Sequence, residues 1–272
     1  MFVGDDDVTL ESRGTVQNES PIGICEGALG SWAHGVIDET NLLTVDVSRF
    51  TLSSITQEIL LSGTSNLAAI GAPGRWEIVK FQRADSLGSG RYILSGFLRG
   101  QRGTEHNRAN HAVGDTFVLL SIAGMLRPNL EAGSIGQKKS YRAVTKGRSL
   151  NSASSQTYAN TAEGLETFSP TNLRRSLVSG GIEFVWVRRT RLSENWLAGI
   201  VPLGEAQERY ELALYTNSTF DVVRRVIPSN SRSAIYTTAM QAEDGYVSGP
   251  LYVRVYQISD VVGRGHPLEI TI

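Results

Sequence analysis

Short apolar segments with an alternating pattern recur along this chain and constrain its fold more than any other feature. Within them every second side chain is apolar, and β-branched and aromatic residues predominate. Successive side chains of a strand point to opposite faces, so a period of two indicates strands with one buried face. The chain is therefore predicted to be mainly β. The clearest strands are expected at 76–84, 91–98, 116–121, 182–188, 210–215 and 251–258.

Two local stretches differ from this strand pattern. Residues 53–62 (SSITQEILLS) carry Ile55, Ile59 and Leu60 at helical spacing, and either of the two opening serines could cap a helix. A short helix is expected there. Residues 85–90 (DSLGSG) contain two glycines, which adopt positive φ at little cost. This segment is predicted to join the first two strands into a hairpin.

The length of 272 residues allows roughly two domains of ordinary size. The stretch 151–160 (NSASSQTYAN) is polar and serine-rich, and it separates two groups of predicted strands. A small β-barrel or sheet domain is therefore expected first and a second β domain after it. The expected order is an N-terminal extended or β segment (1–45), a β-rich domain (46–127), a linker (128–165) and the second domain (166–272).

Charge and cysteine content exclude several classes of protein. Lys plus Arg number 26 and Asp plus Glu number 27, so no strong field attracts nucleic acid or an anionic membrane. The single cysteine, Cys25, excludes a fold held by intramolecular disulfides. The opening MFVGDDDVTL lacks the features of a signal peptide, and no apolar run is long enough to span a membrane. Neither nucleic-acid binding nor membrane insertion is expected, and the chain is predicted to be soluble.

The segment 94–105 (LSGFLRGQRGTE) leaves an alternating strand through two glycines. Positions 100–103 (GQRG) match the GXXG loop by which KH modules clamp a nucleic-acid backbone, but that loop joins two helices. A phosphate-binding P-loop is excluded, because its lysine-containing motif does not occur. The favoured interpretation is a strand exit at which Arg99 and Arg102 pair with a carboxylate such as Glu105, within a loop or across a subunit contact.

The histidines after this loop suggest a metal site only weakly. His106 and His111 lie five residues apart beside Glu105. The zinc-binding HExxH motif needs four-residue spacing on a helix, with the glutamate between the histidines. A solvated polar loop is favoured over a metal site, and no cofactor is expected.

Three glutamates, Glu205, Glu208 and Glu211, are the candidates for acid–base chemistry. Carboxylate catalysis of the glycosidase kind needs two such groups held rigidly across a cleft. Glu208 and Glu211 lie just before and within a predicted strand and are expected to face water. A catalytic role, for example in a cell-wall or polysaccharide hydrolase, is therefore disfavoured.

The aromatic residues indicate a packed core more than a ligand platform. Trp186 shares one face of a predicted strand with other apolar residues and is expected to be buried between two sheets. Trp196, in the polar stretch SENWLAG, is expected to be partly exposed and is a candidate partner contact. Exposed aromatics such as Trp32, Trp196 or Tyr246 would carry binding in a receptor- or carbohydrate-binding module.

The C-terminal hundred residues resemble a fibronectin type III domain. IEFVWVRR resembles the second strand, with Trp186 at the core tryptophan, and YELALY resembles the third strand, with Tyr210 at the usual tyrosine. LYVRVYQISDVVGRGHP resembles the sixth strand and the turn after it. Leu251 stands where that family has its tyrosine-corner residue. The resemblance implies a fibronectin type III-like β-sandwich in which another contact secures this corner.

A longer series of motifs, over about residues 60–272, resembles the C-terminal region of the tail-tip hub proteins of long-tailed bacteriophages and gene transfer agents. The motifs WEIVKFQRA, YILSGFLRGQRGTE, VRRTR and RVYQISDVVGRG occur in the order found in that family. The resemblance implies a structural protein of the virion tail tip or baseplate, made in the host cytoplasm. It also implies a homotrimer that contacts other tail-tip proteins and faces the host surface.

A structural virion protein without catalysis is the favoured function. Balanced charge and a β-sandwich suit a module that packs in a symmetric assembly. A receptor- or carbohydrate-binding module without catalysis remains the alternative. The residues predicted to contact neighbouring subunits or partners are Arg99, Arg102, Glu105 and Trp196.

Overall fold

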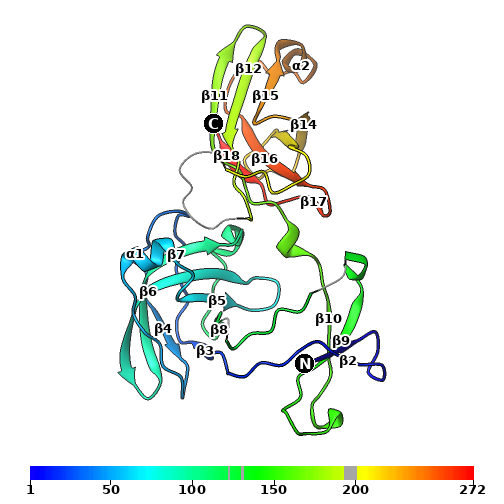
Figure 1. Ribbon diagram of the computed structural model, residues 1–272. Helices are drawn as coiled ribbons and strands as arrows, with labels where there is room; N and C mark the ends of the chain where they lie inside the picture. Colours follow the sequence, from blue (N-terminus) through cyan, green and yellow to red (C-terminus); the bar gives the residue numbers. More distant parts are fainter. Residues whose placement is uncertain (122, 130–131, 193–200) are drawn as a thin grey trace. The chain divides into compact units, whose positions relative to one another are not determined.

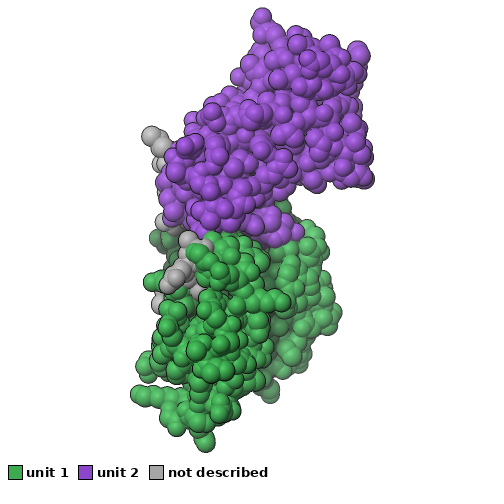
Figure 2. Space-filling view, turned by 90° about the vertical axis from the view of Figure 1, so that its right-hand side faces the viewer, with its two compact units in different colours: residues 1–100, 107–163 green, residues 101–106, 164–272 purple. Residues whose placement is uncertain are grey.

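The computed structural model describes residues 1–121, 123–129, 132–192 and 201–272, and Figure 1 shows the path of the chain. The chain forms two compact units, coloured separately in Figure 2. Unit 1 comprises residues 1–100 and 107–163, and unit 2 comprises residues 101–106 and 164–272. The change of unit after residue 163 falls inside the region expected to hold the boundary. The assignment of residues 101–106 to unit 2 has no counterpart in the sequence-based prediction.

Unit 1 contains a closed six-stranded barrel, with the strand order β3-β4-β7-β6-β5-β8. The small β-barrel expected from the sequence is thus confirmed. Alternate side chains fill its interior, as in other small barrels, and Phe81, Phe97 and Phe117 are fully buried there. The barrel strands are β3 (Ile22–Cys25), β4 (Leu43–Asp46), β5 (Leu67–Gly71), β6 (Glu77–Gly88), β7 (Arg91–Gln101) and β8 (Thr116–Leu119).

The barrel begins earlier in the chain than predicted. β3 and β4 lie mostly within the 1–45 segment, and β4 crosses the expected boundary at residue 45. Each has only four residues, which is too short for alternation to stand out in the sequence. Their inward-facing side chains include Cys25 and Val45, both without exposed surface. Burial, with a contribution from Asp115, raises the pKa of the Cys25 thiol to about 12, so this thiol stays protonated in the core.

The predicted hairpin between the first two strands is confirmed as the β6–β7 pair. Both strands run further than predicted and leave only Ser89 and Gly90 in the turn, with φ values of 53° and 80°. Positive φ at both central residues is the geometry of a type I′ turn. A Cβ atom on Gly90 would lie 1.7 Å from the carbonyl oxygen of Ser48. Glycine is therefore required at this position.

The short helix predicted within 53–62 is confirmed in the second half of that stretch, as α1 (Gln57–Ser62). Its cap is Thr56, whose hydroxyl accepts a hydrogen bond from the N–H of Ile59 at 3.3 Å, and not one of the opening serines. Leu60 is fully buried, whereas Ile59 stays exposed.

Among the described residues no helix is long and apolar enough to cross a membrane. Four 3-10 turns are η1 (Glu105–Asn107), η2 (Ala132–Ser134), η3 (Leu150–Ser152) and η4 (Glu163–Leu165).

The region predicted to be a linker contains two strands of a second sheet in unit 1. β9 (Lys138–Arg142) and β10 (Gln156–Ala159) join β1 (Phe2–Gly4) and β2 (Glu11–Ser12) in the order β10-β9-β1-β2. Aspartates of the β1–β2 turn pair with basic side chains of β9, in the pairs Asp5–Lys139 and Asp7–Arg142. β2, β9 and β10 are short and mostly polar, and β1 has only three residues (FVG). The N-terminal strand β1 pairs with β9, more than 130 residues later in the chain, and this distant pairing has no local sequence signal.

Unit 2 is a β-sandwich, as the resemblance to fibronectin type III domains implies. One sheet has the order β11-β12-β15, and the other has the order β14-β13-β16, with β17 and β18 both pairing with β16. The three motifs that carry the resemblance form the second, third and sixth strands of the unit. Its elements are β11 (Thr171–Val178), β12 (Gly181–Val187), β13 (Tyr210–Tyr215), β14 (Val223–Ser229), β15 (Ser233–Thr237), α2 (Thr238–Glu243), β16 (Tyr252–Ser259), β17 (Gly263–Arg264) and β18 (Leu268–Thr271).

The core of unit 2 is built around the predicted tryptophan. Trp186 is 1% exposed and meets the ring of Tyr210 edge-on, with ring centroids 5.3 Å apart. Leu251 is fully buried at the position of the missing tyrosine corner. Its backbone N–H and C=O both pair with Ile272 at 2.9 Å. Backbone hydrogen bonds therefore secure the corner in place of a tyrosine hydroxyl.

Candidate functional site

Arg99, which the sequence suggested as a partner contact, lies inside unit 1 with no exposed surface. Its guanidinium donates to both carboxylate oxygens of Glu77 at 2.9 and 2.7 Å and to Asp38 at 3.3 Å. It also donates to two backbone carbonyls. A side chain without exposed surface cannot touch another chain, so the prediction of a partner contact at Arg99 is corrected to a buried structural charge.

Glu77 is the centre of this arrangement. Its Oε1 accepts from the backbone N–H of Gly100 at 2.6 Å, and its Oε2 lies 2.6 Å from His111 Nε2. The other ring nitrogen of His111 lies 3.4 Å from Asp115, which accepts from Arg75 at 2.8 Å. Acidic and basic groups therefore alternate along the series. We call it the buried charge network: Asp38, Arg99, Glu77, His111, Asp115 and Arg75.

The network also argues against the interpretation of positions 100–103 as a loop that binds a nucleic-acid phosphate. The N–H of Gly100, which would face a phosphate in such a loop, already binds the carboxylate of Glu77. Gly103 belongs to unit 2, where a Cβ atom would lie 2.7 Å from the ring of Phe168. The backbone N–H of Gly100 is thus used by a carboxylate, and the missing side chain of Gly103 makes room for an aromatic ring. Neither glycine is positioned to form a shared anion cradle.

The ionisation of the network predicts a loss of stability in acid. Burial raises the pKa of Glu77, but hydrogen bonds from His111 and Arg99 outweigh it and hold the pKa below the ordinary 4.5. The pKa of Asp115 is likewise below its ordinary 3.8, because Arg75 outweighs the effect of burial. Such carboxyls stabilise the fold above their unfolded pKa, and this stabilisation is lost as pH falls through the folded pKa.

We therefore expect the free energy of unfolding of unit 1 to fall steadily below about pH 4.5. Urea unfolding followed by hydrogen exchange of the barrel amides measures it. Glu77→Gln should have a shallower pH dependence, since the substituted side chain no longer titrates. An equal pH slope in the wild-type chain and in this variant would contradict the assignment.

The two histidines considered as metal ligands do not converge. His111 belongs to the buried charge network in unit 1. His106 belongs to unit 2, where its ring stacks on that of His266 with centroids 3.7 Å apart. Across the described part of the chain, no group of three or more His, Cys, Asp or Glu side chains is placed to hold a metal ion.

Glu105 and Arg102 lie in the segment of unit 2 formed by residues 101–106. Glu105 pairs with Arg189, whose guanidinium lies over the ring of Phe168 at 5.3 Å from its centroid. Arg102 is exposed and has a φ of 56°, in the left-handed region. Of the predicted contact residues in this segment, Glu105 is mostly buried against Arg189, and Arg102 is the one that presents an exposed side chain.

The VRRTR motif at 187–191 uses its three arginines to bind three different glutamates. The expectation that Glu208 and Glu211 face water is correct only in part, because both are ion-paired and about 30% exposed. Glu208 also accepts a hydrogen bond from the hydroxyl of Tyr210 at 2.9 Å. Glu205 is nearly buried. The ion pairs of the motif are Arg188–Glu208, Arg189–Glu105 and Arg191–Glu205.

Neither of the two aromatic candidates in the described part of the chain, Trp32 and Tyr246, offers a fully exposed platform. Trp196 lies outside the described residues. Trp32 is partly buried, including its indole Nε1. Tyr246 is half-buried, and the guanidinium of Arg224 covers its ring at 5.3 Å from the centroid.

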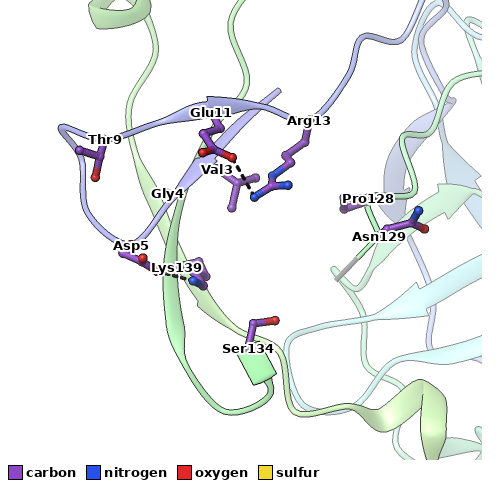
Figure 3. Close-up of a pocket in the computed structure, with 10 residues that line it drawn as sticks. All are labelled: Val3, Gly4, Asp5, Thr9, Glu11, Arg13, Pro128, Asn129, Ser134 and Lys139. Atoms are coloured by element: carbon purple, nitrogen blue, oxygen red, sulfur yellow. Dashed lines mark hydrogen bonds and ion pairs between the residues drawn. The ribbon is translucent and has the colours of Figure 1, made fainter. Parts of the chain in front are cut away.

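A hollow of about 220 Å³ in unit 1 lies beside β1, β2 and β9 (Figure 3). Arg13 and Lys139 extend to it from two sides. Arg13 pairs with Glu11 at 3.1 Å, and Lys139 pairs with Asp5. Because each cation already has a carboxylate, these pairs provide no net charge for an ionic ligand.

Comparison with known proteins adds one match. Residues 20–118 match the family model described as Rcc01698-like, C-terminal. The matched range starts just before β3 and ends within β8, so it corresponds to the barrel of unit 1. It covers less than half of the chain. No curated protein matches the sequence.

Proposed function

We propose that this protein is a structural component of the tail tip of a phage or gene-transfer particle, without a catalytic role. One observation carries the proposal: two motifs that resemble the tail-tip hub family, RGTE and RRTR, meet in unit 2 through Glu105 and Arg189, which lie 84 residues apart in the sequence. Because side chains of the two motifs form an ion pair, both motifs contribute to the same folded unit. The match of the barrel to the Rcc01698-like family supports the proposed relationship to proteins of phage and gene-transfer particles.

The charge arrangement fits an assembly module. Arginines of the VRRTR motif and of the buried charge network are paired within the chain, and the formal net charge is −1. A chain with so small a net charge carries no large field that would repel identical neighbours. We propose that copies of the chain and other tail-tip proteins pack on the exposed parts of both units, with a homotrimer as the expected state. Its location would be the virion tail tip.

The exposed Arg102 provides a test of this role. We expect Arg102→Glu to lower incorporation into particles by about tenfold. A partner surface whose charge is complementary to arginine would repel a glutamate at the same subunit contact. The chain itself should stay folded, since Arg102 is exposed. The measurement is the amount of the protein in purified particles relative to the capsid protein. Arg148→Glu, an exposed position in unit 1, is the matched control.

Incorporation of the Arg102→Glu variant at the wild-type level would remove Arg102 from the assembly contact. Particle imaging with a labelled chain tests the proposal as a whole. A label at the tail tip at fixed stoichiometry is expected. Absence of the protein from purified particles would overturn the tail-tip role.

A further inference from the structure

β11 has an open edge. It is an outer strand of the sheet β11-β12-β15 and pairs only with β12 (Figure 1). Within the described residues, no backbone hydrogen bond other than those to β12 reaches residues 171–178. Six of its eight side chains are exposed. Free N–H and C=O groups along such an edge form a template on which a further strand can pair.

The edge carries two arginines that form no ion pair with any acidic side chain among the described residues. Arg174 donates weakly to Asn172 at 3.4 Å, and Arg175 donates to the main-chain oxygen of Ile272 at 3.2 Å. Neighbouring residues of a strand point to opposite faces, so the two guanidiniums flank the edge on both sides. An added strand would meet positive charge on each face.

The lack of an acidic partner among the described residues distinguishes the two arginines from most of those in residues 164–272. Residues 164–272 contain 11 arginines. Apart from Arg174 and Arg175, only Arg224 forms no ion pair with a described carboxylate, and it covers the ring of Tyr246. The paired ones are Arg188, Arg189, Arg191, Arg209, Arg225, Arg232, Arg254 and Arg264.

A groove of about 640 Å³ adjoins the end of β11, between the β11–β12 hairpin and α2 with the loop that follows it. Leu177 and Val247 line this groove and are 86% and 92% exposed. Ile182 and Tyr246 add apolar surface, and Arg175 is the one charged residue among the described residues that line it. Aliphatic side chains exposed to this degree around one groove are typical of a protein-binding site.

We propose that β11 binds an extended acidic segment of a partner protein, which adds to the sheet as a strand and places an apolar side chain in the groove. Main-chain hydrogen bonds would supply affinity, and the groove and the two arginines would supply specificity. The acidic character follows from charge complementarity, because Arg174 and Arg175 have no acidic side chain as a partner among the described residues, whereas most arginines of residues 164–272 do. The inference goes beyond the tail-tip role and does not depend on it.

The test uses the full chain, labelled with ¹⁵N, and two blocked eight-residue peptides. One contains threonine, valine and leucine with two adjacent glutamates, and its twin carries lysines in place of the glutamates. The glutamate peptide should shift the amide signals of residues 171–178 and protect these amides from hydrogen exchange. The lysine peptide should bind at least about tenfold more weakly.

Two variants separate the contribution of the two arginines to peptide binding from that of the groove. Arg174→Glu with Arg175→Glu should lose about tenfold or more in affinity for the glutamate peptide and should prefer the lysine peptide. Because both arginines are exposed and form no ion pair with a described acidic side chain, the chain should stay folded, which thermal unfolding checks. Leu177→Ser should weaken both peptides through loss of groove contacts. The matched control, Lys146→Glu with Arg148→Glu, makes the same charge change at exposed positions in unit 1 and should leave affinity unchanged.

Several results would overturn the proposal. These are equal binding of the two peptides, unchanged affinity in the arginine double variant, or no protection of residues 171–178 at millimolar peptide. Protection of these amides when the chain alone is concentrated would identify a second copy as the occupant, and it would also refute an acidic partner.

Discussion

Glu77→Ala is expected to destabilise unit 1 by about 3–5 kcal/mol, the range measured when one partner of a buried ion pair is removed. Glu77 has no exposed surface, and its loss would leave Arg99 without its bidentate partner. The same change would remove the acceptors for His111 and for the N–H of Gly100. Urea unfolding, followed through hydrogen exchange of the β6 and β7 amides, gives the free energy.

Glu39→Ala is the matched control for this experiment. Glu39 pairs with Arg83 at 2.8 Å, but both side chains are about half exposed. Exposed pairs contribute about 0–1 kcal/mol because water screens them and competes for both groups. Equal effects of the two substitutions would show that the buried charge network does not hold unit 1 together.

Trp186→Ala is expected to cost unit 2 about 3–5 kcal/mol, as for other large-to-small changes at buried aromatic positions. The side chain is 1% exposed and packs between the two sheets against the ring of Tyr210. Its removal would leave a cavity that the surrounding strands can close only in part. Hydrogen exchange of the β12, β13 and β16 amides in urea measures the loss without relying on the fluorescence of the substituted residue.

Trp186→Phe provides the control, and it should cost clearly less than the alanine substitution. The indole Nε1 of Trp186 has no hydrogen-bond partner among the described residues. Phenylalanine therefore loses no hydrogen bond and keeps most of the apolar volume. A phenylalanine variant as unstable as the alanine variant would mean that volume filling is not what Trp186 contributes.

The elements predicted correctly share a local cause. Alternating apolar residues identified β6, β7, β12, β13 and β16, and a glycine-containing turn identified the β6–β7 hairpin. The spacing of Leu60 and its neighbours identified α1. In each case the residues that set the structure lie within a few positions of one another.

Several of the missed elements depend on distant partners. β1, β2, β3 and β4 have two to four residues each, and β9 and β10 are mostly polar, so any periodicity in them is too short or too weak to identify a strand. Arg99 was expected to pair near its own loop, yet its carboxylates come from Glu77 and Asp38, which lie 22 and 61 positions away. Closure of the barrel brings these groups together in a space that excludes water.

The sequence by itself determined a mainly β chain, because side-chain alternation is a property of neighbouring residues. The fibronectin-like strand order of the C-terminal part came from its resemblance to that family. Only the tertiary structure decided which charges are used within the fold. Arg99 and Arg189 are each bound to an acidic side chain, while Arg174 and Arg175 on the open edge of β11 are paired with none that the structure describes. Ion pairing depends on which strands meet across the fold, and that pairing is not encoded in any short stretch of the chain.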